Sequence, residues 1–464
     1  MKQSTHNKKF AILMIIIILL TMSISGCGGN QDTTPEVDVA FITNPDRSLF
    51  YGETLTIATA ADWFFRPMAR QYMAENPGVN VEIIDLGPSL GDVDSLANMQ
   101  TQISIQLMAG SAPVLIDGIF VDHCDLRSAH FLTDWFPIMD ADPNFNENDW
   151  FMNVFHASAV NDQLHVFPMK FSYEMVTANS TVPSLSGALA AQDSITLSEL
   201  MELHREIPTD NPLFLDPNFD TSWVVQFYLD SFLDVETGWV DFDNDQFIDL
   251  ITYAREITSP DKRFREQWMR NMIDPELETY WSEKYFFQTV TPATGQYFLR
   301  FETGPLFTEL TPLVNVHGEL LVSPWLSCVL NANATPIEQA LAWEFIQFVM
   351  NPDNPRDSIS MQPTNRHLSH YGWEPELTRT IHNVREEWGW QLTSTIDEAV
   401  EDVNARMMAL GDMPMANTRT LPFAIENIID EALELFHNGL VSAEQTAADL
   451  QNRVTLALME MGIN

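Results

Sequence analysis

Strand and helix patterns alternate between residues 54 and 118, and this order constrains the fold more than any other feature of the sequence. Short alternating or apolar runs predict strands, whereas apolar residues at helical spacing predict helices. In chain order the predicted segments are a strand at 55–59, a helix at 65–75, a strand at 79–84, a helix at 96–107 and a strand at 114–116. The β-α-β-α-β order predicts a parallel sheet covered by helices, with right-handed crossovers. Ligands bind beyond the carboxyl ends of such strands, which selects residues 59–63 and 117–120.

Three more helices are predicted from capping boxes, which open at Thr196, Thr335 and Ser442. In a capping box the Ser or Thr side chain and a Glu or Gln three residues later each accept a backbone N–H of the other. Because one long chain carries several βα units, we expect two α/β lobes with more than one crossing between them.

Acidic residues dominate the charge of this 464-residue chain, with 65 Asp and Glu against 23 Lys and Arg and a formal net charge of −42. Phosphate binding needs clustered Lys and Arg, so a nucleic-acid partner is excluded. The hydrophobic fraction of 45% is enough for a large core and argues against disorder. Three cysteines are too few for a disulfide scaffold or a four-cysteine zinc site. We expect Cys124 and Cys328 to be buried thiols, with a disulfide between them as the alternative.

The first 26 residues have the pattern of an export signal. Three lysines precede the apolar run 10–20, which is shorter than the roughly 20 residues of a membrane-spanning helix. The run ends in Ser25, Gly26 and Cys27, and this resembles a bacterial lipobox, which implies a diacylated Cys27 at the mature N-terminus. The alternative is an ordinary signal peptide with a chance cysteine.

Cleavage before Cys27 would remove three lysines and no acid, leaving 20 basic and 65 acidic residues and a net charge of −45. Residues 27–51 are polar at first and contain proline, so we predict a flexible tether there. Two acyl chains on one cysteine are enough for a stable membrane anchor. We therefore expect an extracytoplasmic protein that is lipid-anchored to the cell membrane.

Signatures of catalysis and metal binding are missing from the sequence. It contains no Gly-x-Ser-x-Gly, no His-Glu-x-x-His and no phosphate-binding Gly-rich loop with lysine. The run 140–148 starts like a calcium loop, but Phe145 replaces the required glycine and Phe151 the closing Glu. We predict no catalytic residue, no metal and no cofactor. A glycosidase needs only two well-spaced carboxylates and stays open as an alternative.

Several segments, in order along the chain, carry a resemblance to a known family. They are the strand at 54–59, Glu-Asn-Pro-Gly-Val-Asn-Val at 75–81, Asn-Asp-Gln-Leu-His-Val-Phe-Pro at 161–168, Ala-Trp-Glu-Phe-Ile-Gln-Phe at 342–348, Met-Gln-Pro-Thr-Asn-Arg at 361–366 and the helix at 442–460. Gln163 replaces a glycine that the family usually has. The set resembles the extracellular solute-binding proteins of ABC importers, family 1, which bind sugars and oligosaccharides.

The resemblance implies a periplasmic-binding-protein-like fold, in which each lobe is a mostly parallel sheet flanked by helices and two or three strands form the hinge. Lobe one would take residues 52–170 and 318–362, and lobe two residues 171–317 and 363–464. The implied function is capture of a carbohydrate, expected to be an oligosaccharide, by a monomer that delivers it to ABC permease subunits. A surface sensor or binding lipoprotein without transport is a further alternative.

Sugar binders combine aromatic rings, which cover apolar C–H faces, with carboxylates, amides and Arg, which bind hydroxyls. Trp63 and Asp117 follow predicted strands at the ligand end of the sheet. Core packing is the equal alternative for Trp63, and a helix cap is the equal alternative for Asp117. Trp325 lies in an apolar run whose counterpart in the family carries a cleft aromatic.

The predicted ligand set is completed by three residues elsewhere in the sequence. Trp223 follows a turn-rich segment and can supply a facing ring, although ordinary helix packing is the favoured alternative for it. Glu302 and Arg366 are further polar candidates. Lys170, one of three lysines in the mature chain, lies near the implied hinge, and we expect it to be a solvated surface side chain.

Overall fold

The protein is described by a computed structural model that separates into two compact units, residues 1–36 and 37–464. The structure describes part of the second unit, namely residues 38–90, 93–125, 130–178, 192–205, 221–258, 287–290, 310–351, 362–366, 396–417 and 421–463. The predicted export signal and Cys27 lie outside these ranges. No helix within them is long and apolar enough to cross a membrane.

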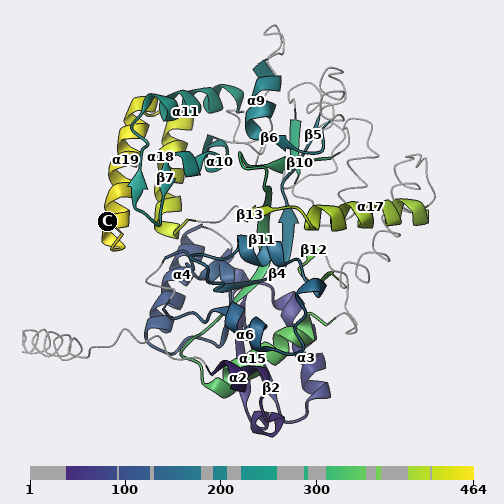
Figure 1. Ribbon diagram of the computed structural model, residues 1–464. Coiled ribbons are helices and arrows are strands. Elements are labelled where there is room, and N and C mark those ends of the chain that lie inside the picture. Colours follow the sequence, from purple (N-terminus) through teal and green to yellow (C-terminus); the bar gives the residue numbers. More distant parts are fainter. Residues whose placement is uncertain are drawn as a thin grey trace, which may run out of the picture. The chain divides into compact units, whose positions relative to one another are not determined.

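The predicted parallel sheet opens the fold (Figure 1). β1 pairs in parallel with β2 on one side and with β3 on the other, and every predicted segment of this stretch is present within a few residues. The elements up to the centre of the sheet are α2 (Val39–Thr43), η1 (Arg47–Phe50), β1 (Thr54–Thr59), α3 (Asp62–Glu75), β2 (Asn80–Asp85), η2 (Gly87–Leu90), α4 (Val93–Met108), β3 (Leu115–Asp117), η3 (Gly118–Phe120), α6 (Trp135–Ala141), η4 (Glu147–Asp149), α7 (Met152–Ala157) and β4 (Val166–Tyr173).

Short strands and longer helices make up the remainder of the described chain. These elements are β5 (Met175–Ala178), β6 (Ile195–Thr196), α9 (Leu197–Arg205), α10 (Thr221–Gln226), η5 (Leu229–Ser231), β7 (Leu233–Asp234), β8 (Trp239–Val240), α11 (Asp245–Ile257), β9 (Phe287–Val290), β10 (Thr311–Val314), β11 (Leu320–Leu330), α15 (Pro336–Val349), β12 (Gln362–Pro363), α17 (Ile396–Gly411), β13 (Met415–Asn417), α18 (Phe423–His437) and α19 (Ala443–Glu460).

Strand β11 holds the sheet together because different parts of it pair with different neighbours. Its last residues pair antiparallel with β3, its middle pairs antiparallel with β4, and its first residues pair in parallel with β13. β10 continues the sheet from the start of β11 toward β5 and β9. All eight residues of β4 are buried, as expected for a strand covered on both faces.

A first core lies around β1, α3, α6 and α15. It contains the buried rings of Trp135, Phe167 and Trp343, whose centroids lie about 5.4 to 6.0 Å apart. The Trp343 Nε1–H donates a hydrogen bond to Asp142 Oδ2 at 2.8 Å, so the polar edge of the buried indole is satisfied. Tyr72 of α3 similarly donates to Glu344 of α15 at 2.7 Å, which ties the two helices together.

A second core is formed by α9, α10, α11, α18, α19 and β10. The last helix, α19, packs there through Ala447, Leu450, Val454 and Ala457. All three predicted capping boxes are confirmed, with the reciprocal bonds present at Thr196, Thr335 and Ser442.

Residues 38–51 are folded, whereas the sequence predicted a flexible tether as far as residue 51. They form α2 and η1, and Ile42 and Phe50 are buried in the first core. Arg47 also pairs with Glu344 of α15. The prediction was wrong for this stretch because its apolar residues bury themselves against a helix almost 300 positions later, which no local pattern reveals.

The two described cysteines, Cys124 and Cys328, are buried free thiols, as expected. Burial raises the pKa of both thiols far above their usual range, and the Asp117 carboxylate adds to this effect at Cys328.

Candidate functional site

A cavity of about 380 Å³ lies next to α10. Its walls come from segments distant in sequence, and Figure 1 shows α10, α18, β13 and the start of β11 close together. The lining residues are Ala157, Glu174, Trp223, Gln226, Phe227, Leu229, Asp230, Asn315, Glu319, Leu321, Met415, Ala416, Asn417, Leu421 and Glu426. The volume lies within the range of roughly 300 to 1,000 Å³ that is usual for small-molecule sites.

Among the predicted ligand residues whose side chains the structure describes, Trp223 lines this cavity. Helix α10, which carries it, is held on α18 by the Thr221 hydroxyl, 3.0 Å from His437 Nδ1, and by a hydrogen bond from Ser222 to Asp430. The Trp223 ring lies 4.0 Å from the ring of Phe227, centroid to centroid, at an interplanar angle of 46°. Trp223 also packs on the second core, so this side chain lines the cavity and takes part in helix packing at the same time.

Backbone pairing fixes the position of Glu174, another residue that lines the cavity. This residue stands between β4 and β5, where its N–H donates to Leu321 O and its carbonyl accepts from Leu313 N, both at 2.9 Å. β10 and β11 therefore hold Glu174 from two sides. Met415 to Asn417 of β13 line the cavity beside it, because β13 pairs in parallel with the start of β11.

The turn between β10 and β11 presents Glu319. Asn315 Nδ2 donates to Glu319 Oε2 at 2.8 Å, and Asn315 Oδ1 accepts from the backbone N–H groups of His317 and Glu319. The amide thus orders the turn and orients the carboxylate. Partial desolvation raises the pKa of the nearby Asp230 carboxyl, the charges of Glu319 and Asp234 raise it further, and His317 opposes them.

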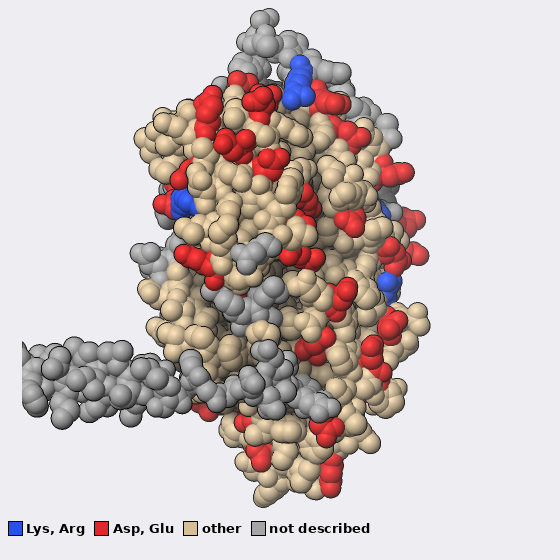
Figure 2. Space-filling model, turned by 60° about the vertical axis from the view of Figure 1, so that its left-hand side comes forward, with Lys and Arg blue, Asp and Glu red and all other residues tan. Residues whose placement is uncertain are grey.

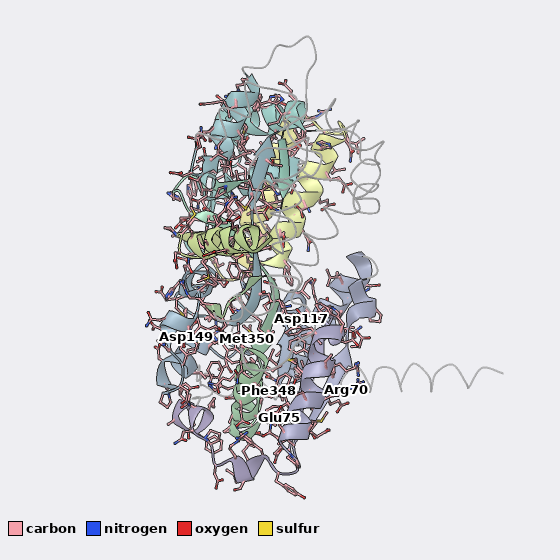
Figure 3. All side chains as sticks on the ribbon, turned by 90° about the vertical axis from the view of Figure 1, so that its right-hand side faces the viewer. Arg70, Glu75, Asp117, Asp149, Phe348 and Met350 are labelled. Carbon is pink, nitrogen blue, oxygen red and sulfur yellow. The ribbon has the colours of Figure 1, made fainter. Side chains whose placement is uncertain are left out.

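Trp63 and Asp117 lie at the carboxyl ends of β1 and β3, as the sequence predicts. Trp63 is 59% exposed near the start of α3. Asp117 is buried and caps η3, and it accepts hydrogen bonds from the Thr59 hydroxyl, Ala60 N and Ile119 N at 3.1 to 3.3 Å. Figure 3 labels Asp117, which lies near the start of α3, and Glu75, which is the last residue of that helix. Neither Trp63 nor Asp117 lines the cavity.

Lys170 is not the solvated surface lysine that we expected, since the residue is only 3% exposed. Its Nζ lies 4.5 Å from the ring centroid of Phe64 and 5.6 Å from that of Trp63. Both rings stand where their negative faces attract the ammonium group. The expectation was wrong because the lysine occupies β4, whose burial on both faces depends on the assembled sheet.

Arg366 lines a separate hollow of about 610 Å³, together with Trp150, Asn153 and Asp412 among others. Its guanidinium pairs with Asp412 at 2.6 Å, donates to Trp150 O at 2.9 Å and lies 4.3 Å from the ring centroid of Phe151. These contacts connect the segment after β12 with the end of α17. The structure therefore does not bring Arg366 and Trp223 into one pocket.

The remaining predicted residues cannot be placed in the cavity. Glu302 lies outside the described residues, and Trp325 belongs to β11 by its backbone while its side chain is not described. Sequence reasoning missed the carboxylates of the cavity wall. No local signal distinguishes them among 65 acidic residues, because they come together only through the folded chain. Within the described residues no group of three or more His, Cys, Asp or Glu side chains could hold a metal ion.

The cavity can therefore stack an apolar ligand face on aromatic rings and bind hydroxyl or amine hydrogens through carboxylates and amides. The described lining residues comprise two aromatic side chains, four carboxylates and three amide side chains. This is the chemistry by which proteins hold hydroxylated small molecules.

Comparison with known proteins identifies the fold. No protein-family model matches the chain, and no curated protein sequence matches it. Among solved structures, the sugar-binding protein MalE from Xanthomonas citri is similar with a TM-score of 0.56 and 12% identity, over 88% of this chain and 98% of that one. An ABC substrate-binding protein from Listeria monocytogenes, in complex with cycloalternan, has a TM-score of 0.52 and 12% identity. The match covers 88% of this chain and 98% of that one.

A solute-binding protein of an ABC transporter from Agrobacterium radiobacter, in complex with ribitol, is similar with a TM-score of 0.52 and 13% identity. The match covers 88% of this chain and 99% of that one. One other similar structure is a designed esterase. At these identities the likeness concerns the fold, which is the two-lobed α/β fold of the extracellular solute-binding proteins, as the sequence predicted.

Proposed function

We propose that this protein, with the fold of the solute-binding proteins of ABC importers, binds a carbohydrate in the Trp223 cavity and delivers it to a membrane permease. An oligosaccharide is the proposed ligand. The observation that carries the proposal is the cavity itself, which is lined by a partly exposed tryptophan together with carboxylates and amides. The similar structures support it, since several of them are sugar-binding proteins.

A thermal-shift screen of the purified protein against a broad panel of mono- and oligosaccharides tests the proposal. A ligand that binds only the folded protein stabilises it by about 2.7 kcal/mol at 100 times its Kd, which gives a measurable rise in Tm. Absence of any shift across the panel would argue strongly against carbohydrate binding.

The role of the tryptophan is tested by measuring affinity in Trp223→Ala for the ligand found in the screen. Removing a buried aromatic contact costs more than about 1.4 kcal/mol, so we expect at least a roughly tenfold weaker Kd. Trp239→Ala is the matched control, because Trp239 is an exposed tryptophan outside the cavity lining.

Trp63, Asp117, Glu302, Trp325 and Arg366 stay proposed ligand residues. They would be tested by single substitutions in the same affinity assay. The proposed lobes, 52–170 with 318–362 and 171–317 with 363–464, would be tested by scattering measurements with and without ligand, because closure should make the protein more compact.

We also propose export after cleavage at residue 26, and diacylation of Cys27. Mass spectrometry of the mature N-terminus should find the lipid, and Cys27→Ser should release the protein from the membrane. Loss of uptake of the identified sugar in a deletion strain would support transport. Binding without an uptake defect would instead favour the role of a surface sensor.

We propose binding without turnover. The cavity carboxylates keep a glycosidase as the second candidate, since two suitably spaced carboxylates are enough for glycoside hydrolysis. Release of chromophore from aryl glycosides, abolished by substitution of a single cavity carboxylate, would establish that activity and refute simple binding.

A further inference from the structure

We propose that Asn315 is a positioning residue of the binding site. Its side-chain amide holds the Glu319 carboxylate in place, and this carboxylate accepts a hydrogen bond from one hydroxyl group of the bound carbohydrate. The pair makes that hydroxyl a requirement for tight binding, so the ligand class is a sugar that carries it. This inference rests on the proposed function and specifies how the same cavity selects its ligand.

Acidic residues alone do not mark a site on this protein. Asp and Glu are spread over the face of the molecule that Figure 2 shows, with few Lys and Arg among them. Glu319 differs because it lines the cavity and an amide of the same turn holds one of its oxygens, at 2.8 Å between Asn315 Nδ2 and Glu319 Oε2. Asn315 lines the cavity as well. The two side chains are therefore a preformed pair at the cavity.

The β10–β11 turn does not depend on the N–H groups of the Asn315 side chain. Asn315 N donates to Glu319 O at 2.9 Å, and Gly318 N donates to Asn315 O at 3.0 Å. Gly318 has a φ of 79°, a conformation that favours glycine. Asn315 Oδ1 supports the turn by accepting from the backbone N–H groups of His317 and Glu319. Within the described residues, Nδ2 serves the Glu319 carboxylate instead of the backbone.

The second oxygen of Glu319 is the group that would contact the ligand. In the described part of the chain, the Glu319 carboxylate accepts one hydrogen bond, from Asn315, and this bond uses Oε2. Oε1 keeps its accepting capacity for a ligand hydroxyl, because both oxygens of a carboxylate accept. A ligand without that hydroxyl would leave a desolvated carboxylate oxygen without a donor, which is unfavourable.

Fixing the glutamate before the ligand arrives favours binding, because the entropy of ordering a flexible side chain is then not lost on association. Immobilising such a side chain at a binding site weakens affinity by roughly 3- to 10-fold. The bond from Asn315 already restricts the Glu319 side chain in the structure. Loss of this bond should therefore weaken binding by roughly this factor while every group that contacts the ligand stays in the chain.

Calorimetric titration of the purified protein with a defined sugar panel tests the proposal. The panel contains glucose, galactose, mannose, maltotriose and cellotriose, with the monodeoxy analogues of each. Asn315→Asp is the decisive variant, since it keeps the oxygen that accepts from the turn but loses the N–H group that holds Glu319. For a panel sugar that binds the parent, this variant should weaken affinity by roughly 3- to 10-fold.

Asn146→Asp is the matched control for the added negative charge. The Asn146 side chain also accepts a backbone N–H, from Asn148, but it lies outside the cavity lining. This variant should leave the affinity of every panel sugar unchanged. Melting curves of both variants should match that of the parent. If Asn315→Asp melts at a lower temperature, titration well below its Tm, where it is folded, still decides.

Exchange of the pair separates orientation from charge. Glu319→Gln keeps the shape of the side chain but removes the carboxylate, and it should weaken binding by roughly tenfold. When Asn315→Asp is added to Glu319→Gln, the amide at 319 can donate to the carboxylate at 315, which restores the bond with donor and acceptor exchanged. The double variant should therefore bind no more weakly than Glu319→Gln alone.

The deoxy analogues identify the hydroxyl. One of them should bind the parent roughly 10- to 100-fold more weakly than the complete sugar, the usual effect of losing a hydrogen bond to a charged group. Glu319→Gln should reduce this discrimination to roughly tenfold or less, because a neutral amide forms the weaker bond. Glu82→Gln, which removes an exposed carboxylate on β2 outside the cavity, should leave the discrimination unchanged.

The outcomes separate the proposed function from the role of the pair. If no panel sugar binds the parent, the proposed function is refuted and this inference with it. If a sugar binds and Asn315→Asp leaves its affinity unchanged, or costs as much in Glu319→Gln as in the parent, the positioning role of Asn315 is overturned while carbohydrate binding stands. Discrimination against deoxy analogues that Glu319→Gln does not reduce would overturn the role of Glu319.

Discussion

Replacing Asp122 with Asn should remove a loss of stability that the protein suffers between pH about 4 and 6. Asp122 follows η3 and accepts hydrogen bonds from Phe423 N at 2.9 Å and Asp125 N at 3.1 Å, so its carboxylate binds the first N–H of α18. Burial raises the pKa of this carboxyl to about 6, against an ordinary value of 3.8, and the nearby Asp125 contributes to the rise. The charged form is therefore disfavoured in the folded state.

The sign and size of the effect follow from linkage. Because the folded-state pKa of Asp122 is raised, the unfolded chain loses its proton first as pH rises. The free energy of unfolding should therefore fall between pH about 4 and 6, and the full penalty should be present above pH 6. A difference of about 2 pH units corresponds to about 3 kcal/mol, and we take about 2 kcal/mol for a side chain that is only partly buried.

Asparagine has nearly the shape of the acid but one accepting oxygen, so Asp122→Asn removes the charge and also loses one of the two bonds from Asp125 N and Phe423 N. The lost bond lowers stability at every pH, whereas the effect of the charge depends on pH. Urea unfolding should therefore show that the stability of the variant relative to the parent is about 2 kcal/mol higher at pH 7.5 than at pH 4. Asp243→Asn, at an exposed position, is the control and should show no such pH dependence. A stability difference that is the same at both pH values would refute the reasoning.

Other predictions concern the buried indole, a helix cap and the thiols. Trp343→Phe leaves the buried Asp142 carboxylate without the indole donor and should cost about 1 to 3 kcal/mol of unfolding free energy in urea; no loss would mean that this bond is dispensable. Ser442→Ala removes the N-cap acceptor of α19 and should lower stability by about 1 kcal/mol, whereas Ser442→Thr should lose less. Because burial raises their thiol pKa, Cys124 and Cys328 should not react with a thiol reagent at pH 8 in the folded Cys27→Ser variant. Both should react in guanidinium, and labelling of the folded form would contradict their burial.

Local features of the structure could be predicted from the sequence because neighbouring residues carry them. The capping box at Thr335 needs only a hydroxyl and a Glu three residues later, and both bonds are present. The strands around β1 were predicted from short apolar runs, and their parallel pairing was predicted from the helices between them. Asp117 was placed correctly at the end of β3, although its cap of η3 was one of two open alternatives.

Side-chain environments at the centre of the sheet could not be predicted in the same way. Lys170 is charged and sits in an otherwise apolar strand, which by itself suggests exposure. Its burial under Trp63 and Phe64 follows from the pairing of β4 with β11, more than 150 residues later. The folded stretch 38–51 has the same explanation, since the surface that Ile42 covers belongs to a helix near residue 344.

The sequence by itself determined the order of strands and helices, the helix caps and the strong acidity, because each depends on residue type and short-range spacing. Only the tertiary structure decided which acids and which tryptophan share a cavity. Trp223, Glu319 and Glu426 lie some 100 residues apart along the chain, and they line one space because β11 pairs with β10 and β13 while α10 packs on α18. Contacts between such distant segments depend on the assembled sheet, and no local pattern records them.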